Sequence, residues 1–195
     1  MRTVQRDLLV LGPLLLLGTL ALTGCTPEPV PQAPQASETT APTDAPVFAS
    51  DEEALAAATE AYAAYLAMSD QILAEGGENP DRIRAFSTET LAEIEMEGYA
   101  QVRSNKLRSV GESRFSDLIL QDLSLTEKAG RGIVTTYLCS DISEVDVVNV
   151  NGDSVVKDAR PDFTPFIVSF DLVSREPVKL LVSSADVWDG AGICK

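Results

Sequence analysis

Three cysteines, four tyrosines and scattered carboxylates are the side chains of this sequence that could do chemistry. The chain has 195 residues and no histidine. Histidine is the commonest general base and the commonest metal ligand, so its absence excludes catalysis by Ser-His-Asp and Cys-His arrangements. A catalytic site would have to be built without histidine, for example around a carboxylate or a tyrosine, and binding without catalysis is the other interpretation.

The charge of the chain restricts its partners. The formal net charge is −15, and without residues 1–24 the chain has 13 basic and 29 acidic residues, a net charge of −16. Nucleic acid and anionic lipid headgroups repel so acidic a chain, and we expect neither as a direct partner. The simplest interpretation of the acidity is solubility at a cell surface.

Cys25 stands where an apolar segment ends and a proline-rich segment begins. Residues 1–24 start with Arg2 and Arg6, continue through the apolar run 8–22 and end on Thr-Gly, which is the layout of a secretory signal. A membrane-spanning helix needs about 20 apolar residues, more than this run offers. We therefore expect residues 1–24 to be an export signal, and the Cys25 that follows it is either a modified residue or a chance cysteine.

Leu22-Thr23-Gly24-Cys25 resembles the lipobox of bacterial lipoproteins. The resemblance implies that the Cys25 thiol receives a diacylglycerol and that cleavage makes Cys25 the first residue. One acyl chain such as palmitate holds a protein only marginally, whereas two chains on one cysteine give a durable membrane anchor. The implied location is outside the cell, attached by lipid to the outer face of the cell membrane.

Residues 25–49 form a tether between this anchor and the rest of the chain. The segment from Thr26 to Ser50 contains six of the chain's eleven prolines, with Thr, Ser, Gln and Ala between them. Such a composition buries too little apolar surface to offset the entropy of ordering. We expect a spacer here and a globular domain over residues 50–195.

Helical patterns come first in that domain. Ser50 and Glu53 have the spacing of a capping box, and apolar residues then recur at helical intervals until Gly76-Gly77. After Pro80 we expect a second helical stretch in two pieces, residues 81–86 and residues 88 to about 106.

Alternating apolar residues follow Gly111 and predict strands over 115–125, 131–141, 163–174 and 177–188, with a tight turn at Asn151-Gly152. Phe166, Val168 and Phe170 share one face of their strand. The alternation places Asp186 on the same face as Val182. No helical segment separates the strands, so we predict an α+β domain whose N-terminal helices pack on one face of an antiparallel sheet.

This order of helices and strands resembles the cystatin-like, nuclear-transport-factor-2-like fold, in which a bent antiparallel sheet wraps a long helix and leaves a conical cavity. Residues 139–155, followed by the terminal W-x-G-x-x-x-C pattern of residues 188–194, also resemble uncharacterised secreted lipoproteins of actinobacteria. The cone implies a cavity lined by apolar and aromatic side chains, and our candidates are Tyr62, Tyr65, Phe166, Val168, Phe170 and Trp188.

Cys139 and Cys194 are the two thiols that remain once Cys25 carries lipid. An exported chain is in an oxidising environment, which favours a disulfide between them. The bridge would close a loop of about 55 residues and stabilise the fold by roughly 4 kcal/mol in the chain-entropy model. Two buried free cysteines or a redox pair are the alternatives.

Carboxylates offer two further kinds of site. The oxygen ligands at Asp141, Glu144 and Asp146 do not have the spacing of a calcium loop, so we expect solvated loop residues and no metal or cofactor. Folds of the cone type include isomerases that use an Asp base with a Tyr partner. Asp171 or Asp186, with one of the helix tyrosines, would be needed for that chemistry.

We expect a tethered domain that binds a small apolar ligand or an envelope protein without catalysis. The alternative is an enzyme of the isomerase or cyclase type that uses a carboxylate or a tyrosine in the cone. No residue set in the sequence matches a catalytic motif by type and spacing.

Overall fold

The computed structural model describes residues 46–116, 118–124 and 132–194. The expected signal, Cys25 and the tether up to residue 45 lie outside the described residues. The described residues all belong to one compact unit. Among the described residues, no helix is long and apolar enough to cross a membrane.

Three helical elements open the domain: α1 (Asp51–Ala74), the 3-10 helix η1 (Pro80–Ala85) and α2 (Glu89–Ser104). The Ser50 hydroxyl accepts a hydrogen bond from the Glu53 N–H, which caps the start of α1. The Glu53 carboxylate accepts one from the N–H of Ala49, one residue before the cap. The helix α1 ends where the glycine pair predicted it. Gly77 has a φ of +80°, and a side chain there would collide with the carbonyl oxygen of Tyr99 in α2.

Antiparallel strands follow in two groups. The five-stranded sheet has the order β2-β4-β6-β7, and β3 pairs with β4 beside β2. A separate pair joins β1 to β5. The strands are β1 (Arg108–Val110), β2 (Arg114–Phe115), β3 (Ile119–Leu123), β4 (Val134–Asp141), β5 (Asp146–Val148), β6 (Phe163–Arg175) and β7 (Val178–Val187). The strand predicted over 115–125 is therefore two short strands, β2 and β3.

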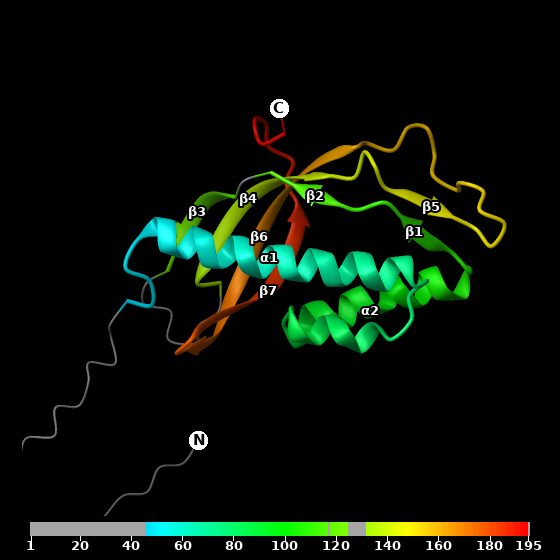
Figure 1. Cartoon of the computed structure of the whole chain (residues 1–195). Helices are drawn as coiled ribbons and strands as arrows, with labels where there is room; N and C mark the ends of the chain where they lie inside the picture. Colours follow the sequence, from blue (N-terminus) through cyan, green and yellow to red (C-terminus); the bar gives the residue numbers. More distant parts are fainter. Residues whose placement is uncertain (1–45, 117, 125–131, 195) are drawn as a thin grey trace, which may run out of the picture. The chain divides into compact units, whose positions relative to one another are not determined.

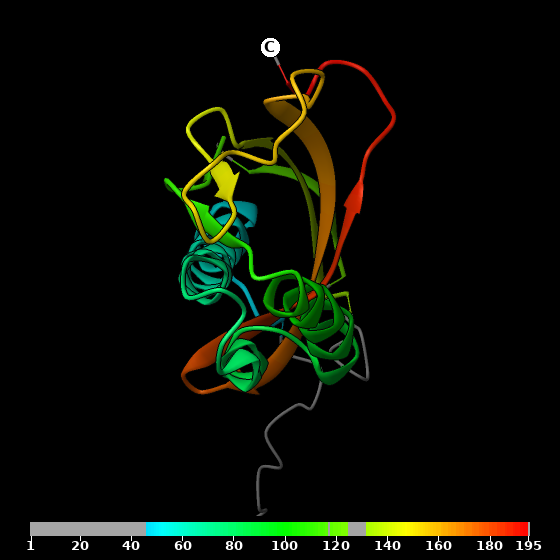
Figure 2. The same ribbon diagram turned by 90° about the vertical axis from the view of Figure 1, so that its right-hand side faces the viewer.

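The sheet curls strongly around α1, and α2 lies beside it (Figures 1 and 2). This arrangement confirms the predicted α+β class, with N-terminal helices packed on a bent antiparallel sheet. The inner face of the sheet supplies Val134, Thr136, Leu138, Val168, Phe170, Leu180 and Val182, all buried. These side chains pack in one core with buried residues of α1, including Ala54, Ala58, Tyr62 and Tyr65.

A β-bulge in β7 changes the face of the sheet on which Asp186 lies. Val182 lies opposite Phe170 and Ala185 lies opposite Val168, so three steps along β7 match two along β6. Beyond the extra residue the alternation is reversed, because opposite residues of an antiparallel pair share a face. Asp186 is therefore exposed on the outer face, and the expectation that it shares the inner face of Val182 is wrong.

A disulfide joins Cys139 near the end of β4 to Cys194 near the C-terminus. The Cα atoms are 5.1 Å apart and the sequence separation is 55 residues. The predicted disulfide is therefore present, and the two cysteines are not free thiols.

Candidate functional site

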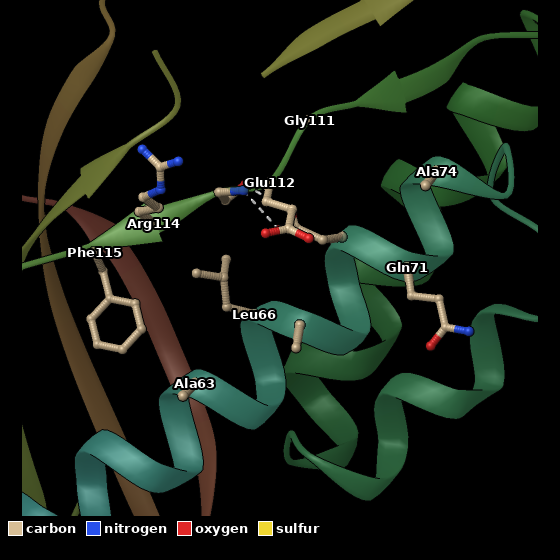
Figure 3. A pocket seen from close by; sticks show the side chains of 11 residues that line it. Ala63, Leu66, Gln71, Ala74, Gly111, Glu112, Arg114 and Phe115 are labelled. Carbon is tan, nitrogen blue, oxygen red and sulfur yellow. Dashed lines mark hydrogen bonds between the residues drawn. The ribbon is translucent and has the colours of Figure 1, made fainter. Parts of the chain in front are cut away.

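A cleft of about 700 Å³ lies between the second half of α1 and the segment that leads from β1 to β2 (Figure 3). The volume falls in the range of small-molecule sites, which is about 300–1,000 Å³. One wall is the helix and the other is the short segment Gly111–Phe115. The lining residues are Ala63, Leu66, Ala67, Asp70, Gln71, Ala74, Gly111, Glu112, Ser113, Arg114 and Phe115.

The helix wall is shallow because most of its side chains are small and apolar, and Asp70 and Gln71 are its polar members. Ala63, Ala67 and Ala74 fall on one stripe of α1, since residues three or four apart lie on the same helix face. Leu66 flanks this stripe. At one end of the cleft Phe115 packs edge-on against Tyr62, with 4.9 Å between the ring centroids and 85° between the ring planes.

Hydrogen bonds anchor the opposite wall at its middle residue and just beyond its last residue. Both carboxylate oxygens of Asp70 accept hydrogen bonds from Ser113, one from the backbone N–H and one from the hydroxyl, each at 2.8 Å (dashed in Figure 3). Ser116 donates its N–H to the Cys139 carbonyl, and its hydroxyl accepts a hydrogen bond from the Cys139 N–H, both at 2.9 Å. The wall is therefore attached to α1 on one side and to the disulfide-bonded strand β4 on the other.

Glycine is required where this wall begins. Gly111 has a φ of +92°, a conformation that other residues rarely adopt. A side chain there would also collide with the carbonyl oxygen of Glu144. The close approach brings Glu144 near Arg114, and the two side chains form an exposed ion pair that holds the pKa of Arg114 above its ordinary value.

Of the six side chains predicted to line a cavity, five lie in or against the core and one lies on the outer face of the sheet. Tyr62, Tyr65, Val168 and Phe170 are buried in the core, and the half-buried Phe166 packs against it. Trp188 packs on Tyr137, with 4.9 Å between the ring centroids, on the other face. The structure brings the first five together, and none of the six is among the residues that line the cleft.

Two of the helix tyrosines make polar contacts between α1 and α2. The Tyr65 hydroxyl donates to Glu95 at 2.7 Å, and the Tyr99 hydroxyl donates to Ser69 at 3.0 Å. Burial, reinforced by the Glu95 carboxylate, raises the pKa of Tyr62 to about 12 and the pKa values of Tyr65 and Tyr99 well above the ordinary range. These hydroxyls therefore keep their protons at neutral pH and act as hydrogen-bond donors.

The carboxylates considered for metal binding or catalysis have other partners. Asp141 accepts hydrogen bonds from the N–H and hydroxyl of Ser143, and Asp146 accepts one from the Ser154 hydroxyl. Asp171 accepts a hydrogen bond from the Gly132 N–H at 2.7 Å. Within the part of the chain that the structure describes, no group of three or more potential ligands is arranged to hold a metal ion.

The sequence contained a signal for this cleft that our prediction did not use. Alanines at helical spacing in the second half of α1 leave room beside the helix, and Gly111 marks a close approach of another segment. Alternation and helical periodicity point to large apolar residues instead, and in this fold those residues fill the core.

Comparison of the chain with protein-family models, with curated protein sequences and with solved structures finds no significant match.

Proposed function

We propose that the protein is an exported lipoprotein, attached to the outer face of the cell membrane through lipid on Cys25, whose domain binds a small apolar ligand in the α1 cleft without catalysis. The observation that carries the binding role is the cleft itself. It combines a helix wall of small apolar side chains with a second wall that hydrogen bonds fix in place. The curled sheet around a helix agrees with the cystatin-like, nuclear-transport-factor-2-like resemblance.

Binding is a better explanation of the cleft than catalysis because two of its three charged groups already have structural partners, and the third, Glu112, is exposed. Both oxygens of Asp70 are occupied by Ser113, and Arg114 is paired with Glu144. An enzyme of the isomerase type would need a base that is free to take a proton from the ligand. Turnover of a bound compound that disappears in Asp70→Asn would favour that alternative.

The binding role is tested with a fragment from Thr26 to Lys195, which needs no detergent and contains the whole described core. The probe is N-phenylnaphthylamine, a neutral dye that fluoresces in apolar sites. Ala67→Phe fills the cleft, whereas Ala56→Phe adds the same ring at an exposed position of α1 outside it.

The proposal predicts saturable dye binding. Ala67→Phe should weaken it at least about tenfold, which corresponds to about 1.4 kcal/mol of binding free energy, and Ala56→Phe should leave it unchanged. Equal binding by the two variants would contradict it. Dye binding that an envelope protein extract displaces would indicate a protein occupant for the same cleft.

The anchor is tested in the full chain by labelling cells with an alkyne analogue of palmitate. Cys25→Ser should abolish labelling and either release the protein or leave an uncleaved precursor, since the acylated thiol is lost. Cys139→Ser, a matched change in the domain, should keep the label. Labelling that survives Cys25→Ser would exclude the proposed anchor.

A further inference from the structure

From the charges around the α1 cleft we propose that its ligand is an amphiphile with an apolar body and a cationic, amine-type head. This inference rests on the proposed binding function and adds the chemical class of the ligand. It depends on how polar and apolar groups are distributed along the cleft.

The cleft is polar at one end and apolar at the other. Ala63, Leu66 and Phe115 belong to the apolar end, where the Phe115 ring points toward the helix in Figure 3. Asp70 and Gln71 lie one to two turns further along α1, toward its C-terminus, on the same cleft. From Ala63 to Ala74 the helix rises about 16 Å, so the length suits an extended aliphatic chain with a polar head.

The polar end has an excess of negative charge. Asp70 and Glu112 contribute two carboxylates to the lining, and Arg114 is the one cation among the lining residues. Successive residues of a strand point to opposite sides, and Arg114 points away from the cleft while Phe115 points into it (Figure 3). Arg114 is also paired with Glu144, so its charge is balanced outside the cleft.

Among the described residues, the two carboxylates inside the cleft form no ion pair, and Arg114 interacts with Glu112 more weakly than with Glu144. Asp70 accepts its two hydrogen bonds from the neutral groups of Ser113, which orient the carboxylate and leave its charge in place. Glu112 is exposed and forms no ion pair with any residue that the structure describes. A cationic head at this end would be attracted by both carboxylates, and an anionic head would be repelled by both.

The end of α1 favours the same sign of charge. The C-terminus of a helix is the negative end of its dipole, and the last turn of α1 contains no basic residue. Arg103 donates a hydrogen bond to the carbonyl of Gly77, beyond the helix end, but does not line the cleft. The cleft therefore selects for a cation beside Asp70 and Ala74, with the apolar body extending toward Phe115.

The test compares three probes with one chain length in the Thr26–Lys195 fragment: decylammonium, decanol and decanoate. The affinity of each probe is measured by its displacement of N-phenylnaphthylamine at neutral pH and low salt. Decylammonium should bind roughly fivefold more tightly than decanol, and decanoate should bind most weakly, as expected for partly exposed charges. Glu112→Gln should reduce the preference for the amine to about twofold.

Glu97→Gln is the matched control because it makes the same change of charge at an exposed position of α2, away from the cleft. It should leave the amine preference unchanged. Equal binding of the three probes, or an equal effect of the two variants, would overturn the cationic head while the binding function stands. Dye binding that does not respond to Ala67→Phe would overturn both.

Discussion

Burial of the Tyr62 hydroxyl makes the stability of the domain depend on alkaline pH. The side chain is 5% exposed, and burial raises its pKa from 10.0 to about 12, with the carboxylates of Glu95 and Asp70 acting in the same direction. The folded state then keeps a proton that the unfolded state has lost. The contribution of this proton to the free energy of unfolding is fully present below about pH 10 and is lost as the pH rises through about 12.

Tyr62→Phe removes this titration and retains the ring that packs on Phe115. We expect the variant to lose about 2–3 kcal/mol less free energy of unfolding than the parent chain over that pH interval. Urea denaturation at several pH values measures the difference. Identical pH profiles would show that Tyr62 ionises normally in the folded state.

Thr136 places a hydroxyl group in the core without a hydrogen-bond partner among the described residues. Its side chain is fully buried on the inner face of β4, and its hydroxyl oxygen has no hydrogen-bond partner among the described residues. Thr136→Val keeps the shape and removes the unsatisfied group, so the free energy of unfolding should rise by about 1 kcal/mol in chemical denaturation. Thr135→Val is the control, because that hydroxyl lies 3.2 Å from the Ser169 hydroxyl on the outer face. A loss of stability in Thr136→Val equal to that in the control would refute the argument.

At the scale of elements, the hydrogen bonds that hold the segment Gly111–Phe115 to α1 come from a single side chain, Asp70. Asp70→Ala removes both acceptors of Ser113, so the N–H of Ser113 should exchange with solvent faster and the free energy of unfolding should fall by about 1–3 kcal/mol. Asp70→Asn retains one acceptor and should show an intermediate effect. Hydrogen exchange followed by mass spectrometry measures the first change. Unchanged exchange at Ser113 in Asp70→Ala would show that other contacts hold this wall.

Local patterns predicted the elements whose boundaries depend on nearby residues. Ser50, Glu53 and the pair Gly76-Gly77 define α1 because capping and the left-handed turn are local chemistry. The division of the predicted strand 115–125 is different, since it depends on Ser116 pairing with Cys139, a residue far along the chain. The bulge in β7 likewise depends on its register with β6, which alternation within one strand cannot reveal.

The alanine stripe and Gly111 indicate that something approaches α1, but the sequence does not show which segment forms the second wall of the cleft, for the same reason. Its two walls are separated by about 40 residues of chain, and no periodicity within α1 indicates which segment will lie opposite Ala67. The resemblance to a conical fold, together with the facing of the predicted elements, predicts Tyr62, Tyr65 and Phe170 as cavity lining. In the structure these residues are buried in the core.

At the scale of the whole molecule, the Cys139–Cys194 bridge secures the C-terminal residues to the sheet. Closing a loop of 55 residues restricts the unfolded chain, so Cys194→Ser should lower the free energy of unfolding by roughly 2–4 kcal/mol. Thermal denaturation of oxidised parent, reduced parent and variant measures the effect, and the last two should agree. A reduced parent as stable as the oxidised one would contradict a stabilising role.

The central claim is that the domain holds a small apolar ligand in the cleft beside α1. The most direct measurement is an NMR titration of the ¹⁵N-labelled Thr26–Lys195 fragment with decylammonium, which reports the location of the ligand. The account predicts saturable shifts, with one common affinity, at the amides of Gly111 to Phe115 and along α1 from Ala63 to Ala74. Shifts that do not saturate, or that centre on residues outside these two walls, would contradict it.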